Sequence, residues 1–215
     1  MLHRWLTCFL LLVASATTLQ AGQAVQPLEY IDDGGGFGTV VWPYPGGVDD
    51  ASRRLDTIIP AAAFNQLFPN GLRFYGLWDA TEIWLNSNGN ISFGNPVTTF
   101  TPESFRAEAD TPMIAAFFAD VDTTGEPALS DDGGTSTGNG FIYGGISLVR
   151  EAVYFTWNDV GSYRAQGNPP NAFQIILRKV NDEGDFNIEL RYESVQWIAG
   201  ELQKAPEGTD RKSVV

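Results

Sequence analysis

The sequence has very little cysteine or histidine, and it has no long hydrophobic run after its first residues. Its one cysteine, Cys8, and its one histidine, His3, both lie before residue 25. That region combines a weakly basic start with a short apolar run, Trp5 to Ala16, followed by small residues. The run is too short to span a bilayer and is typical of a cleaved secretory signal. We therefore expect a signal peptide over residues 1–24 and no transmembrane segment in the mature chain.

The loss of both residues with the signal excludes several kinds of chemistry. A mature chain without cysteine and histidine has no disulfide, no histidine-dependent triad, no cysteine nucleophile and no usual structural zinc site. An exported protein without disulfides also favours a bacterial origin.

The charge balance excludes a further class of partner. The chain has 13 basic and 26 acidic residues, and removal of Arg4 with the signal leaves 12 against 26, a net charge of −14. Nucleic acid and anionic membrane surfaces are disfavoured partners, because phosphate binding needs positive charge. Acidity of this size serves solubility in the simplest interpretation, and calcium binding is the second interpretation, because hard cations prefer carboxylate oxygens.

The remainder of the chain is rich in glycine, with 23 residues, and in aromatics, at 13%. Short β-rich runs alternate with turn signals, such as Asn88-Gly89, Gly144-Gly145 and Pro169-Pro170, and no convincing helical period is present. This pattern predicts an all-β, antiparallel β-sandwich-like single domain. The expected strands cover residues 37–42, 82–85, 90–93, 113–118 (buried on both faces), 141–143, 146–149, 152–157, 173–180 and 186–192.

The last of these strands has the clearest alternation. Phe186, Ile188, Leu190 and Tyr192 alternate with polar residues, which predicts one buried and one wet face. The polar residues of the wet face are Asn187, Glu189, Arg191 and Glu193. Before the strands, residues 25–54 are expected to form a lead-in segment with a polar, flexible start around Gly34-Gly35-Gly36. Residues 49–55, where that segment ends, are interpreted as either one helical turn or a capped loop.

Four motifs in order give the chain a family resemblance. They are FPNGLRFYGLWDATEIWLNSNGNISF at 68–93, TPMIAAFFADVDTT at 111–124, VYFTWNDVGSY at 153–163, and NAFQIIL at 171–177 followed by GDFNIELRYESVQW at 184–197. Together they resemble the extracellular nidogen-type (NIDO) domain. The resemblance implies a cell–matrix adhesion module that is not an enzyme, and it supplies no catalytic residues.

The resemblance also bears on the ends of the domain. We assign residues 55–207 to the NIDO-like domain. Family members continue beyond the Gln196-Trp197 motif, so the domain is expected to be incomplete at its C-terminus. Residues 208–215 resemble translated non-native sequence rather than a natural tail.

Paired aspartates are the candidate metal ligands. Asp120 and Asp122 lie two apart, so on a strand both carboxylates point to one face, and Asp159 lies in a later strand-end turn. Together they can bind Ca²⁺, but the spacing is not that of an EF-hand. The alternative interpretation is that these side chains accept hydrogen bonds from turn amides.

Two other functions remain open at this stage. A paired-carboxylate glycosidase needs no histidine, and Glu82, Glu189 and Glu193 are its candidate residues. A carbohydrate-binding module is the stronger alternative, with an aromatic platform for sugar rings if the side chains are exposed. The candidate platform residues are Trp78, Trp84, Trp157, Tyr163 and Trp197. The primary expectation is a secreted adhesion module without a cofactor other than Ca²⁺, whose partner is an extracellular-matrix or cell-surface protein or glycan.

Overall fold

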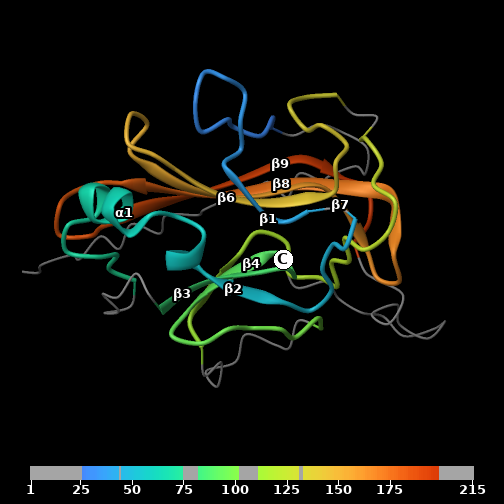
Figure 1. Cartoon of the computed structure of the whole chain (residues 1–215), viewed down its shortest axis with the longest axis horizontal. Helices are drawn as coiled ribbons and strands as arrows, with labels where there is room; N and C mark the ends of the chain where they lie inside the picture. Colours follow the sequence, from blue (N-terminus) through green and yellow to red (C-terminus); the bar gives the residue numbers. More distant parts are fainter. Residues whose placement is uncertain (1–25, 44, 75–81, 102–110, 131–132, 199–215) are drawn as a thin grey trace, which may run out of the picture.

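The computed structural model describes residues 26–43, 45–74, 82–101, 111–130 and 133–198, which form two facing antiparallel sheets (Figure 1). The five-stranded sheet has the order β1–β6–β7–β8–β9, and the four-stranded sheet has the order β2–β3–β4–β5. The strands of the first sheet are β1 (Thr39–Trp42), β6 (Phe141–Ser147), β7 (Ala152–Ser162), β8 (Gln166–Lys179) and β9 (Phe186–Val195). The second sheet contains β2 (Ser52–Arg54), β3 (Ile83–Asn86), β4 (Asn90–Phe93) and β5 (Met113–Ala115).

The helical content of the described residues is small. A 3₁₀ turn, η1 (Leu55–Thr57), and one short helix, α1 (Ala61–Leu67), follow β2. No helix in the described part of the chain is long and apolar enough to cross a membrane. The expected all-β antiparallel sandwich is confirmed. The expected signal peptide, the expected C-terminal tail and Trp78 lie outside the described residues.

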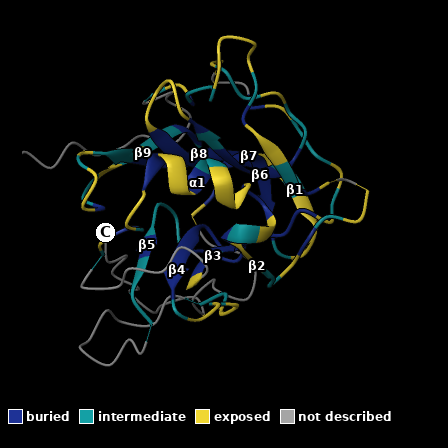
Figure 2. Cartoon of the chain, turned by 60° about the vertical axis from the view of Figure 1, so that its left-hand side comes forward, coloured by how far each residue is buried: buried dark blue, intermediate teal, exposed yellow. Residues whose placement is uncertain are grey.

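The main core lies between the two sheets (Figure 2). Alternate residues of β7, including Phe155 and Trp157, pack with Leu85 and Ile91 of the facing sheet, and all are fully buried. Trp157 stacks on Phe173 with ring centroids 5.0 Å apart. Burial of each such side chain contributes about 1.5–3 kcal/mol, so this layer holds the sheets together.

The expected lead-in is built into the sandwich. Within residues 26–54, β1 joins the five-stranded sheet and β2 joins the four-stranded sheet. Leu28 and Phe37 are buried, at 2% and 4% exposure. For residues 49–55 the sequence allowed either one helical turn or a capped loop. In the structure these residues contain β2, and the 3₁₀ turn begins only at Leu55. The segment also contributes Val41, Trp42 and Val48 to the main core.

Two turn signals of the sequence belong to strands. Gly144 and Gly145 lie within β6, and the hairpin turn comes later, at residues 148–151. A Cβ on Gly144 would lie 2.5 Å from Ile58 Cγ2, so this glycine permits close packing rather than a turn. Pro169 and Pro170 lie inside β8 where neither β7 nor β9 pairs with it, so no ladder hydrogen bond is lost.

The apolar run at 113–118 forms a shorter strand than expected. β5 covers only Met113–Ala115 and is an edge strand, so it is not buried on both faces. The run leaves the sheet so that Phe117 can pack against Phe173 and, edge to face, against Trp197.

The alternation of β9 is oriented as predicted but is not fully buried. Tyr192 and Leu190 pair with Phe173 and Ile175, whose side chains face the core. Leu190 is 36% exposed and Ile188 is 45% exposed, because β9 is the edge of its sheet. The face that the sequence predicted to be buried is therefore only partly covered at these two residues.

Candidate functional site

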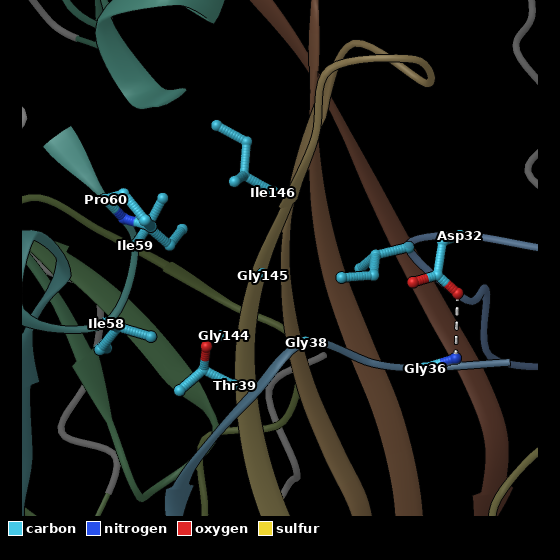
Figure 3. A pocket seen from close by; sticks show the side chains of 11 residues that line it. Asp32, Gly36, Gly38, Thr39, Ile58, Ile59, Pro60, Gly144, Gly145 and Ile146 are labelled. Carbon is cyan, nitrogen blue, oxygen red and sulfur yellow. Dashed lines mark hydrogen bonds between the residues drawn. The ribbon is translucent and has the colours of Figure 1, made fainter. Parts of the chain in front are cut away.

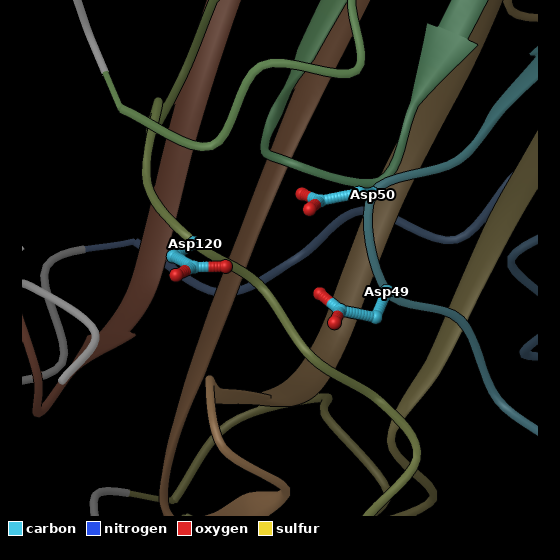
Figure 4. A group of neighbouring side chains, drawn as sticks. All are labelled: Asp49, Asp50 and Asp120. Atoms are coloured by element: carbon cyan, nitrogen blue, oxygen red, sulfur yellow. The ribbon is translucent and has the colours of Figure 1, made fainter. Parts of the chain in front are cut away.

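Three aspartates meet where the connection between β1 and β2 passes the segment after β5 (Figure 4). Asp49 and Asp50 come from the first connection, and Asp120 comes from the second. One carboxylate oxygen of each lies within 4.8 Å of the others. Asp120 is almost fully buried, at 2% exposure, whereas Asp49 is exposed. We call these three residues the acidic cluster.

The hairpin turn between β3 and β4 positions two members of the acidic cluster. Asn88 Nδ2 donates to Asp50 Oδ1 at 2.8 Å, and Asn88 Oδ1 accepts from the backbone N–H of Val121 at 3.0 Å. The next residue, Gly89, has φ +78°, and a Cβ there would lie 1.7 Å from the carbonyl oxygen of Phe117. Only glycine allows the turn to pack directly on this segment.

Backbone pairing fixes the other side of the cluster. The N–H of Thr123 donates to Val48 O at 2.9 Å, and the N–H of Val48 donates to Thr123 Oγ1 at 2.8 Å. Asp49 and Asp122 form an isolated antiparallel bridge. The two acidic connections are therefore held together by main-chain contacts, even though their carboxylates repel one another.

Burial and this repulsion perturb two of the carboxyl groups. Burial, followed by the charges of Asp50, Asp49 and Asp122, raises the pKa of Asp120 to about 7. Asp49 is exposed as a residue, but partial desolvation of its carboxyl group, followed by the charges of Asp50 and Asp122, raises its pKa to about 6. The native fold thus maintains a concentration of negative charge that a proton or a cation would relieve.

The acidic cluster has the chemistry and size for a divalent cation. Calcium binds carboxylate oxygens at about 2.3–2.6 Å, so opposite ligands of one ion lie about 5 Å apart. The 4.8 Å limit on the oxygen separations fits within that sphere. Asp49, Asp50 and Asp120 are the described residues that can hold such an ion.

The structure separates the three aspartates that the sequence proposed as calcium ligands. Asp122 lies beside the acidic cluster, but its carboxylate accepts hydrogen bonds from the N–H groups of Thr124 and Ala165. Asp159 is fully buried in β7 and accepts from the N–H of Gly138 at 2.6 Å. These two therefore follow the turn-amide interpretation. Sequence reasoning missed Asp49 and Asp50, although a pair of consecutive aspartates after Gly46-Gly47 was the available signal.

The three glutamates of the glycosidase alternative do not converge. Glu193 is fully buried and accepts hydrogen bonds from backbone N–H groups, and Glu189 pairs with Arg178 and Arg191. Glu82 is exposed and adjoins β3, in the other sheet. The described cavity in Figure 3, about 350 Å³, has a single carboxylate in its lining, that of Asp32, which accepts from the N–H groups of Gly34 and Gly36.

The aromatic residues of the sugar-binding alternative do not form a platform in the described part of the chain. Trp157 and Trp197 are buried in the core, and their indole N–H groups donate to Ser87 O and Val160 O. Trp84 and Tyr163 are half-buried. These aromatic residues thus contribute to packing rather than to a flat exposed surface.

Comparison with known proteins places the chain in a family. The model of the nidogen-like domain matches residues 81–214. The chain belongs to the nidogen-like domain family. Within this nidogen-like domain lie the turn at Asn88-Gly89 and Asp120, whereas Asp49 and Asp50 precede the matched residues. The resemblance noted from the sequence motifs is thereby confirmed.

Alpha-tectorin is among the relatives of this nidogen-like domain. The chain is 30% identical over 139 residues to alpha-tectorin of Homo sapiens and, equally, to that of Mus musculus. The aligned part covers 59% of this chain and 6% of either relative, so the chain spans only a small fraction of the length of these proteins. No solved structure matches the chain.

Proposed function

We propose that this nidogen-like domain is a secreted, non-enzymatic adhesion module of the cell–matrix type, which acts by binding proteins through its surface. The observation that carries the proposal is family membership combined with the state of the buried acidic groups. The buried Glu193 and Asp159 each accept backbone hydrogen bonds that fix loops, which makes them structural groups rather than reactive ones.

A binding panel tests this proposal directly. The full chain is immobilised, and extracellular-matrix proteins, cell-surface proteins and a glycan array are passed over it. We expect saturable binding to at least one protein and none to the glycans. Binding to glycans alone would favour the carbohydrate-binding alternative, and hydrolysis of a glycan would contradict a non-enzymatic role.

We expect Ca²⁺ to be the ion for the acidic cluster, because the donors are all carboxylate oxygens. The panel is therefore run in Ca²⁺ and in chelator. Loss of protein binding in chelator would connect the acidic cluster to adhesion. Equal binding in both would place the adhesion surface elsewhere and leave the adhesion proposal intact.

A further inference from the structure

The outer face of the five-stranded sheet is covered by residues 26–31, which we call the strap. In Figure 1 this blue segment lies on the side of the sheet away from the four-stranded sheet. Side chains of the sheet and of the loop at residues 133–137 hold its main chain. The N–H of Leu28 donates to Glu193 Oε2 at 2.8 Å, and Leu28 O accepts from Thr135 Oγ1 at 2.7 Å. Gln174 Oε1 accepts from the N–H of Glu29 at 3.0 Å, and Gln174 Nε2 donates to Glu29 O at 2.9 Å.

Two side chains of the strap occupy different environments on this face. Leu28 is 2% exposed and packs with Phe37 and Ala172. The Glu29 carboxylate accepts from Arg178 Nη2 at 2.7 Å and from Arg191 Nη2 at 2.9 Å. The sheet therefore recognises an extended segment in which an apolar residue is followed by an acidic one. Main-chain hydrogen bonds combined with side-chain pockets are the general way in which proteins bind extended peptides.

The receiving surface, which we call the groove, consists of the outer face of β7, β8 and β9 and residues 133–137. Glu193 lies at its base with no exposed surface, and its carboxylate also accepts from the N–H groups of Thr135 and Ser136. Burial alone would raise the pKa of Glu193, but hydrogen bonds from Thr135, Leu28 and Ser136 lower it. The strap thus supplies one of the donors that keep a buried charge satisfied, and an empty groove would leave that charge short of a partner.

The covalent link between the strap and the sandwich is rich in glycine. Residues 32–36 lead from the strap to Phe37, which is 4% exposed and packs against Leu28, and they contain three consecutive glycines, of which Gly35 has a φ of +84°. Such a link can change direction at little steric cost. Because a second copy carries an identical strap, it can make the same contacts with the groove.

We propose that the groove is a peptide-recognition site that accepts residues 26–31 of a second copy, so that two chains exchange their straps reciprocally. In the structure the strap fills the groove of its own chain. The exchanged form keeps the contacts between strap and groove and changes those within the link, such as the hydrogen bond from the N–H of Ile31 to Gly36 O. This inference concerns self-association and does not rest on the adhesion proposal.

A charge-reversal experiment on the full chain tests the exchange. The strap variant is Glu29→Arg. The groove variant is Arg178→Glu/Glu189→Arg/Arg191→Glu, which reverses the network but keeps its internal ion pairs, since Glu189 bonds both arginines. In each variant alone, residue 29 carries the same charge as residues 178 and 191, which bind it in the wild-type chain. In a mixture, each strap meets a groove of opposite charge, so we expect a 1:1 heterodimer with twice the mass of a single chain by light scattering.

The matched control is one chain that carries all four substitutions, in which strap and groove are again complementary. We expect this control to protect the backbone amides of residues 26–31 from hydrogen exchange as well as the wild-type chain does, and the two separate variants to lose that protection. A mixture that stays at single-chain mass, with a protected control, would show that the strap binds only within its own chain and would overturn the proposal. An unprotected control would overturn it too, because Glu29 would then not be recognised.

Energy transfer between two differently labelled wild-type pools gives a second measurement, which does not depend on the folding of any variant. Exchange predicts a signal that appears after mixing and rises with protein concentration. A signal that stays absent at all concentrations would contradict the proposal.

Discussion

Replacement of Asp120 by asparagine is expected to stabilise the protein, although it removes a buried polar contact partner. Asp120 is 2% exposed, and burial and the neighbouring carboxylates raise its pKa from 3.8 to about 7. That rise corresponds to about 4 kcal/mol of unfavourable free energy for the ionised group in the native state. Since Asp49 and Asp50 share the repulsion, we expect Asp120→Asn to raise the free energy of unfolding at pH 8 by about 2–4 kcal/mol.

The pH dependence gives the sharper form of this prediction. A group whose pKa is raised in the folded state contributes stability that is fully present below its unfolded pKa and is lost as the pH rises through its folded pKa. The wild-type free energy of unfolding should therefore fall between pH 5 and pH 8, and Asp120→Asn should flatten that slope. The assay is urea unfolding, followed by tryptophan fluorescence, at several pH values in the presence of chelator.

The matched control for this experiment is Asp182→Asn. Its side chain is 72% exposed and lies in the β8–β9 turn, so it should leave both the stability and the slope near wild-type values. The reasoning is refuted if the wild-type stability is constant or rises between pH 5 and pH 8 and Asp120→Asn is no more stable.

Three further predictions concern the acidic cluster, the hairpin turn and the core. Calcium at millimolar concentration should raise the melting temperature of the wild-type chain at pH 7.5 but not that of Asp120→Asn, as measured by calorimetry; equal shifts in both would exclude the acidic cluster as the site. Gly89→Ala should cost at least about 3 kcal/mol in urea unfolding, whereas Gly94→Ala, at φ +88° with open space, should cost about 1–2 kcal/mol. Leu177→Ala should cost about 2–5 kcal/mol and Leu190→Ala clearly less, and equal costs would contradict the assigned burial.

The parts of the fold that the sequence predicted are those with local causes. The Asn-Gly turn determines the β3–β4 hairpin because positive φ is needed within two residues of the strand ends, and the observed pairing of Asn86 with Asn90 follows from it. Glycine at 144 gave the same local signal for a different reason, which is the approach of Ile58 from a distant part of the chain. A single sequence cannot distinguish a glycine that a turn requires from a glycine that close packing of a distant residue requires.

The acidic cluster shows the same limit at longer range. Asp120 was identified because Asp122 follows two residues later, but its actual partners, Asp49 and Asp50, lie about 70 residues earlier in the sequence. They meet it through main-chain pairing between Val48 and Thr123. No periodicity records such a pairing, since neither segment is a regular strand at that point.

The outer face of the five-stranded sheet reveals what the alternation in a strand does and does not encode. The alternation of apolar and polar residues in β9 predicted which of its side chains face the other sheet. It also assigned Glu193 to the solvent-exposed face, but Glu193 has no exposed surface. Thr156 and Gln174, on the same face of β7 and β8, are also fully buried and bonded to each other. A row of buried polar side chains is unfavourable beneath an apolar cover, but it suits a cover made of peptide main chain, which brings its own donors and acceptors. The polar outer row is thus the sequence signature of the strap, and its pattern of donors and acceptors is what a strap from a second copy would have to match.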